Sequence, residues 1–219
     1  GELVDTWEQR FSPVLRQVRQ GLFTTLHKVV HEPDTESLLL LSEYIDDPCF
    51  GTKLGEFDLP IDAAMALGFL VVRQVAALHE RGVAHNNVNP AALLFKGLHE
   101  TGTVQPSMIG LVEPSLSAEA MQGDVRALCA MILSWLGPRR IGQLPTKVRP
   151  TFEALRVRLE AWAQNPTVAP PGIDTLVAVT SDGLAMVDFN FSVLRDSGGD
   201  LQEYAVLILS HRLYHLLWP

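Results

Sequence analysis

The chain has 219 residues, of which 47% are hydrophobic and 19% charged, with a formal net charge of −8 at pH 7. This length and composition predict a globular protein with one sizeable core and exclude wholesale disorder. The excess of acidic residues, 25 Asp+Glu against 17 Lys+Arg, disfavours direct binding to nucleic acid or to anionic membranes, because both of these carry negative charge.

Two cysteines, Cys49 and Cys129, are too few for a disulfide framework or a four-ligand zinc site. Cys129 lies in an apolar run, where a free thiol is expected to pack as a small hydrophobic group. The chain opens without a signal-peptide pattern and has no uncharged apolar stretch of the roughly 20 residues that a membrane span needs. We therefore expect an intracellular protein, nuclear or cytoplasmic, that does not bind membranes.

The N-terminal part of the sequence predicts a helix followed by two strands. Residues 5–20 carry apolar side chains at three- and four-residue spacing, which is typical of a helix, and Gly21 is expected to end it. Strand-like runs follow at 22–31 and 37–45, and the segment Glu32-Pro33-Asp34 predicts the turn that joins them.

The middle of the sequence begins with the longest helical pattern of the chain. Residues 59–81 form a wide apolar stripe, and Gly82 is expected to end this helix because glycine readily adopts the left-handed conformation. A polar loop at 86–90 follows, and then two short strand-like runs at 91–95 and 108–112.

The remaining sequence predicts helices separated by a linker and a hairpin. Residues 124–136 are apolar enough for a buried helix, and residues 150–164 are amphipathic. The Pro-rich segment 165–172 is expected to be a linker. A hairpin is predicted over 176–189, turning on Ser181-Asp182-Gly183, and a final helix over 201–218.

Three segments resemble eukaryotic protein kinases. Residues 78–95, LHERGVAHNNVNPAALLF, resemble the end of the long helix and the catalytic loop, which in that family reads Leu-His, a few residues, Gly-Ile/Val-x-His-Arg-Asp-Leu-Lys-Pro-x-Asn and an apolar run. Residues 38–45, LLLLSEYI, are similar to the strand that enters the interlobe hinge. Residues 124–132, DVRALCAMI, are similar to the buried helix that opens Asp-Val-x-Ser-Leu-Gly.

This resemblance covers roughly residues 5–164 and implies an α+β, protein-kinase-like fold. It places a reduced N-lobe at residues 1–50, with a helix and strands leading to the hinge, and a mostly helical C-lobe at residues 51–164. Residues 165–219 are then expected to form a hairpin–helix extension packed on the C-lobe.

At the positions that carry kinase chemistry, the resemblance assigns neutral residues. Asn87 stands where a carboxylate accepts the proton of the substrate hydroxyl, and Asn89 stands where a Lys steadies the transferred phosphate. Ala92 replaces the Asn that ligates the second magnesium ion, and Gly110-Leu111-Val112 stands where the Asp-Phe-Gly metal motif is expected. The resemblance therefore implies a pseudokinase that neither catalyses phosphoryl transfer nor binds ATP, magnesium or another cofactor.

Two residues are expected to keep structural roles from the same pattern. His85 is expected to pack and hydrogen-bond within the loop and so hold its backbone, rather than to act as a general base. Asp124 is expected to tether the backbone of this loop through its carboxylate.

A second resemblance leaves an alternative open. Residues 176–190 also resemble a kinase strand pair that ends at Asp-Phe-Gly, and residues 200–207 resemble the buried helix. In that frame Asp188 would be the metal-binding residue and residues 98–173 an insertion, while in the first frame Glu113 is the only carboxylate near the metal position. The alternative function is an atypical active phosphotransferase, or a nucleotide-binding regulatory module, that uses Asp188 or Glu113 for metal.

The resemblance implies a protein–protein interaction scaffold with protein partners. The segment Gly51-Thr52-Lys53-Leu54 is similar to a motif of the mitotic-checkpoint kinases, and the degraded loop also suits kinetochore pseudokinases of kinetoplastids. Both families imply a role in chromosome segregation at the kinetochore, in the nucleus. Trp162, Tyr214 and Trp218 are candidate anchors for a partner, and ordinary packing is the other interpretation of all three.

Overall fold

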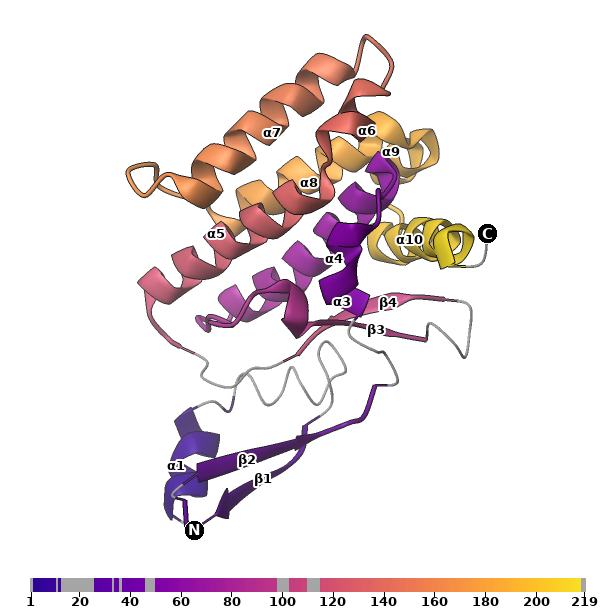
Figure 1. Cartoon of the computed structure of the whole chain (residues 1–219). Coiled ribbons are helices and arrows are strands. Elements are labelled where there is room, and N and C mark those ends of the chain that lie inside the picture. Colours follow the sequence, from indigo (N-terminus) through magenta and orange to yellow (C-terminus); the bar gives the residue numbers. More distant parts are fainter. Residues whose placement is uncertain are drawn as a thin grey trace.

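The computed structural model of the chain describes residues 2–10, 12, 26–32, 34–35, 37–45, 50–97, 103–109 and 115–217. Within this part the protein is a mixed α+β structure in which helices dominate, with two separate antiparallel two-stranded sheets (Figure 1). The α+β class expected from the sequence is confirmed at this level.

The first sheet is an antiparallel hairpin of β1 (Leu26–Glu32) and β2 (Ser37–Ser42). Side chains alternate between the two faces of a strand, and Val29 is buried on one face. On the other face, Leu39 and Leu41 of β2 are 45% and 49% exposed. Both strands expected in this region are confirmed, and the hairpin leaves apolar surface in contact with solvent.

The first helix, α1 (Glu2–Arg10), lies beside this hairpin and contacts β1 (Figure 1). The sequence predicts a helix over residues 5–20. The structure confirms it for residues 5–10 and 12, while residues 13–20 lie outside the described part of the chain.

The centre of the molecule is α4 (Ile61–His79), which is surrounded by other helices (Figure 1). It is apolar on nearly its whole circumference, which is typical of a central helix. Gly82 follows it at φ 72, in the left-handed conformation expected there. Among the described helices, α4 alone has the length and composition of a membrane span, and 83% of its apolar stretch is buried inside the protein.

The second sheet follows a short 3-10 helix, η2 (Pro90–Ala92), and pairs β3 (Leu93–Lys96) with β4 (Gln105–Met108) in antiparallel register. The first of these strands agrees with the sequence. The second is predicted at 108–112, but the structure places it earlier, because its pairing with β3 ends at Met108. Residues 110–112 lie outside the described part.

Two connections join the first sheet to the second. Glu43, just after β2, forms an ion pair with Lys96 of β3. Further along the chain, α3 (Phe50–Lys53) packs against η2 and β3, and η1 (Leu54–Glu56) continues from it. The buried side chain of Leu54 joins this connection to the main core.

Three helices follow the second sheet: α5 (Ala118–Trp135), α6 (Pro138–Gly142) and α7 (Arg149–Gln164). The buried helix and the amphipathic helix expected here are confirmed as α5 and α7. Arg126 of α5 donates hydrogen bonds to three carbonyl oxygens at the end of α7 and just beyond it, those of Trp162, Asn165 and Val168. A cation at a helix C-terminus is favourable because the carbonyl ends carry partial negative charge.

The hairpin predicted over residues 176–189 is wrong. The structure has one continuous helix there, α8 (Ile173–Val187), packed along α4. The buried residues in this stretch follow helical spacing, since Leu176, Thr180 and Leu184 recur every fourth residue on one side of the helix.

Gly183 explains why the turn signal misled. A Cβ atom at this position would collide with the side chain of Met65 on α4. The absence of a Cβ atom at Gly183 leaves room for the side chain of Met65 between the two helices. The Ser181-Asp182-Gly183 segment lies inside α8 and makes no turn.

The chain ends with α9 (Phe189–Asp196) and α10 (Leu201–Leu217), the second of which is the final helix expected from the sequence. Residues of both helices join the same buried cluster as α4 and α5, namely Phe191, Ala205, Ile208, Leu209 and Leu213. The C-terminal region packs on the helical body. It consists of three helices that share the main core, and the hairpin–helix form predicted for it is wrong.

Candidate functional site

The candidate site is the loop between α4 and η2, and Asp124 of α5 holds its backbone. The carboxylate of Asp124 accepts the backbone N–H of His85 at 2.6 Å and that of Asn86 at 2.8 Å. It also lies 2.9 Å from Nε2 of His79. Asp124 is 2% exposed, and a buried carboxylate is stable only with such donors around it. The structure shows the tether that the sequence predicts for this residue.

The position of Asp124 follows from the start of α5. Ser117 caps this helix, because its hydroxyl oxygen accepts the N–H of Ala120 at 3.0 Å. Asp124 then lies on the second turn, on the face that also buries Val125 and Leu128. The helix therefore carries the carboxylate to the loop on a rigid support.

Asn86 turns the loop sharply. Its backbone has φ 57, the left-handed conformation that Asn adopts more readily than most non-glycine residues. The N–H of the same residue donates to Asp124. The buried carboxylate of Asp124 therefore bonds the same residue that adopts the costly left-handed conformation, and it helps to hold Asn86 there.

The side chain of His85 is fully buried inside this arrangement. Burial lowers the pKa of His85 to about 4, an effect that the negative charge of Asp124 opposes and that His79 adds to slightly. The ring is therefore neutral near pH 7 and is shielded from solvent. This environment suits the packing role expected for His85.

The next part of the loop is held by its own side-chain amides. Nδ2 of Asn89 donates to the backbone oxygen of Asn87 at 3.1 Å and to its Oδ1 at 2.7 Å. Oδ1 of Asn89 accepts the N–H groups of Ala91 at 2.8 Å and Ala92 at 3.1 Å, and so caps η2. The amide of Asn89 is thereby committed to the loop itself. Ala92 is buried and offers only a methyl group.

The segment predicted to replace the metal motif, Gly110-Leu111-Val112, lies outside the described residues, and so does Glu113. Residues on both sides of it are bonded to the loop region. Ile109 donates its N–H to the oxygen of Ala92 at 2.7 Å, and Ser115 forms a two-way bridge with Ala84. The chain therefore enters and leaves this segment beside the candidate site.

Two polar residues that hold β4 were not found by sequence analysis. Gln74 is buried within α4, where its Nε2 donates to the oxygen of Pro106 at 2.5 Å and its Oε1 accepts the N–H of Met108 at 3.0 Å. Ser210 of α10 accepts the N–H of Val104 at 2.7 Å. The one available signal for Gln74 was a polar residue inside an otherwise apolar helical stripe.

Gly51, the first residue of the tetrapeptide Gly51-Thr52-Lys53-Leu54, has a packing role. A Cβ atom at this position would collide with the backbone oxygens of Pro90 and Leu93. α3 can therefore approach η2 and β3 closely only with glycine here. Leu54, at the other end of the tetrapeptide, is buried in the core.

Asp188 does not follow a strand pair, which the alternative frame requires. It precedes α9, where its Oδ1 accepts the N–H of Phe191 at 2.7 Å as the N-cap of that helix. The strand pair that the alternative frame requires is replaced by α8. The frame that made Asp188 the metal-binding residue is therefore wrong.

The three candidate anchors lie in different surroundings. Trp162 is half-buried against the core, with the guanidinium of Arg158 6.0 Å from its ring centre, which favours the packing interpretation. Tyr214 is 55% exposed on α10. Trp218 lies outside the described residues.

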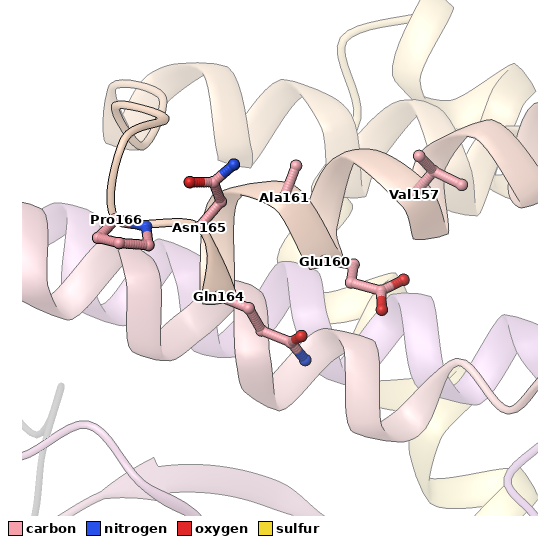
Figure 2. Close-up of a pocket in the computed structure, with 6 residues that line it drawn as sticks. All are labelled: Val157, Glu160, Ala161, Gln164, Asn165 and Pro166. Carbon is pink, nitrogen blue, oxygen red and sulfur yellow. The ribbon is translucent and has the colours of Figure 1, made fainter.

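An open depression of approximately 490 Å³ runs along the exposed side of α7 and the start of the following linker (Figure 2). Its lining residues are Val157, Glu160, Ala161, Gln164, Asn165 and Pro166. Two amides and one carboxylate line it, and none belongs to the candidate loop. The depression is therefore separate from the candidate loop.

The part of the chain that the structure describes contains no cluster of three or more His, Cys, Asp or Glu side chains that could hold a metal ion. Cys129 is buried in α5, and this burial raises the pKa of its thiol to about 12, while Arg126 lowers it to a smaller extent. The thiol is therefore protonated near neutral pH and packs as the small hydrophobic group expected from the sequence.

A comparison with models of known protein families and a search of curated proteins find no match for this chain. Its function is therefore inferred from its residues and their geometry alone.

Proposed function

We propose that this chain is a kinase-like domain that has lost phosphoryl transfer and acts by binding protein partners. Support comes from the order of its elements: a long central helix, a loop, a short hairpin and a buried helix. The Asp124 carboxylate links the last of these to the loop. This order and this tether agree with the motifs that resemble the kinase catalytic loop.

The proposed loss of activity rests on which side chains stand in the loop and on what they bond to. Phosphoryl transfer depends on charged groups that orient the nucleophile and neutralise the phosphate. Here the amide of Asn89 is bonded to Asn87 and to the first turn of η2, and Ala92 has no ligand atom. The described part of the loop keeps its shape through these amide hydrogen bonds and through the buried carboxylate of Asp124, so the groups named here are engaged within the loop itself.

A scaffold also needs accessible anchors. The exposed apolar residues of the α8–α9 junction are Met186 at 48%, Phe189 at 79% and Val193 at 51% exposure, and we name them the α8–α9 patch. Phe189 and Val193 lie one turn apart on α9, so they share a face. Large exposed apolar side chains are common at protein interfaces.

Within this proposal, a kinetochore role rests only on Gly51-Thr52-Lys53-Leu54 and on the degraded loop. The packing of Gly51 against η2 and β3 explains that glycine without any particular pathway. The general scaffold function is therefore the part of the proposal that we develop into experiments.

The loss of nucleotide binding is tested by thermal shift with ATP, with and without Mg²⁺, next to an active kinase as positive control. We expect no shift, and no transfer of labelled phosphate to a generic substrate. Asn87→Asp should not create activity, because Asn89 and Ala92 remain unchanged. A shift of several degrees would favour the nucleotide-binding alternative, and phosphate transfer by the wild-type protein would overturn the proposal.

The scaffold function is tested by affinity capture with the wild-type domain and with Phe189→Asp. The matched control is Val157→Asp, which places the same charge at a 65% exposed apolar position on α7. We expect Phe189→Asp to lose a partner that Val157→Asp retains, with both proteins as stable as the wild type. If no protein is captured reproducibly and no purified candidate binds, the scaffold proposal fails.

A further inference from the structure

The outward face of α10 carries two histidines one helical turn apart. The opposite face is buried against the core through Ala205, Ile208, Leu209 and Leu213. His211 and His215 are both exposed, and they follow Leu207 at the four-residue spacing that places side chains on one face. The helix therefore presents both imidazoles to solvent.

The distance between the two ring centres is similar to that between two imidazoles bound to the same metal ion. Their centroids lie 4.7 Å apart, with 73° between the ring planes. Metal–nitrogen bonds of about 2.0–2.1 Å would place the centroids of two coordinated imidazoles about 4.5–5.3 Å apart. The observed centroid separation lies in this range, and the two rings meet edge to face.

The neighbouring cation does not oppose binding at this face. Arg212 lies between the two histidines in sequence, but its guanidinium bonds Oδ2 of Asp62 on α4, at 2.8 Å from Nε and 2.6 Å from one terminal nitrogen. This pair holds the arginine against α4. The ring of Tyr214 lies 5.7 Å from that of His215 and shields one side of it.

We propose that His211 and His215 form a two-ligand site for a first-row transition-metal ion such as Zn²⁺, Ni²⁺ or Cu²⁺. Neutral imidazole is a preferred ligand for these ions, and affinity is expected to be highest for Cu²⁺. The histidines supply two ligands and water supplies the rest, in keeping with the lack of a larger cluster among the described residues. The site is independent of the proposed scaffold function.

Two donors on one helix bind far more tightly than one. Once the first imidazole holds the ion, the second meets it at high effective concentration, so loss of either ring is expected to weaken binding by about a hundredfold. The bound ion would join successive turns of α10, and the helix holds the two imidazoles at a spacing that the unfolded chain does not fix. It should therefore raise the melting temperature of the protein.

The test uses the untagged full chain, titrated with ZnCl₂, NiCl₂ and CuCl₂ in a calorimeter. The variants are His211→Ala and His215→Ala. The matched control is His27→Ala, which removes an exposed histidine of β1 that is distant in sequence from α10. Circular dichroism verifies that all variants keep their helix content.

We expect one ion per chain for the wild type and for His27→Ala, and about a hundredfold weaker binding for each α10 variant. In spectra of histidine side chains, substoichiometric Cu²⁺ should broaden the signals of His211 and His215 first. The proposal is overturned if the wild type binds no ion with one-to-one stoichiometry. It is also overturned if either α10 variant binds as tightly as the wild type.

Discussion

The described part of the chain contains two antiparallel hairpins in very different surroundings, the first with strands of seven and six residues and the second with two strands of four residues. In β3–β4, Leu93, Phe95 and Met108 are buried, and the strands lie next to the helical body (Figure 1). In β1–β2, Leu39 and Leu41 stand half in solvent. Both hairpins are paired in antiparallel register, and they differ in how much of each is covered by the rest of the protein.

This difference in burial indicates which contacts stabilise a small sheet. A two-stranded hairpin is at best marginal in water and needs a helix or further strands to pack against. Gln74 of α4 supplies β4 with a donor and an acceptor, and Ser210 of α10 binds the chain just before it. The loop before β3 is fixed by Asp124. We therefore expect substitutions around the second hairpin to cost more than those on the first.

The largest effect is expected for Asp124→Ala. The substitution removes the acceptor for two backbone N–H groups and the partner of His79, all in a buried setting. We expect a loss of about 4 kcal/mol in the free energy of unfolding, since broken buried charge networks leave unpaired groups behind. Urea denaturation of the purified variant measures this loss.

The control is Asp196→Ala, which removes an exposed carboxylate at the end of α9. Within the described residues its one ion pair is with Arg195 on the surface, so we expect a change within about 0.5 kcal/mol. Equal effects of the two substitutions would contradict the role given to Asp124.

A second large effect concerns pH. Burial lowers the pKa of His85 to about 4 from the ordinary histidine value of 6.5. The unfolded chain binds this proton more readily than the folded protein does. The stability associated with the neutral ring is therefore complete above pH 6.5 and is lost as the pH falls from 6.5 toward 4. The loss amounts to about 3 kcal/mol.

Unfolding by urea at several values between pH 7 and pH 4 measures this effect. His85→Gln removes the titrating ring, so the stability of the wild type relative to this variant should decline across that window. His27→Gln, at an exposed position of β1, should leave the wild-type profile unchanged. A constant difference between wild type and His85→Gln would show that His85 is not buried as described.

Gln74→Ala tests the contact between α4 and the second hairpin directly. It leaves the N–H of Met108 and the oxygen of Pro106 without this partner and opens a small cavity. We expect a loss of about 2 kcal/mol, together with faster hydrogen exchange in β4. Gln122→Ala, at an exposed position of α5, is the control and should change neither quantity.

Sequence patterns located most elements of the fold, because the spacing of apolar residues within a segment is enough to reveal its buried face. The periods of α4, α5, α7 and α10 are helical, and Gly82 marks the end of α4. The failure at α8 has a specific cause: Ser181-Asp182-Gly183 is a turn signal in isolation. Its meaning changes when Gly183 faces Met65 of another helix, and that contact cannot be read from a single segment.

The candidate site likewise contains some contacts that the sequence predicted and others that it did not. The tether by Asp124 could be expected because a resemblance placed it opposite the loop. Gln74 and Ser210 could not, since their partners are backbone groups 34 and 106 residues away in the sequence. Such contacts are set by the packing of the helices, which composition and periodicity do not specify.

The smallest effect is expected on the first hairpin, for Leu41→Ser. Leu41 is 49% exposed, so truncating it removes little buried area and leaves no unpaired polar group. We expect a change within about 0.5 kcal/mol in urea denaturation. The matched substitution in the second hairpin is Leu93→Ser, which places a hydroxyl in a fully buried position of β3 and should cost about 3 kcal/mol or more. If Leu41→Ser is as costly as Leu93→Ser, then the first hairpin is covered in solution, and exposure does not distinguish the two sheets.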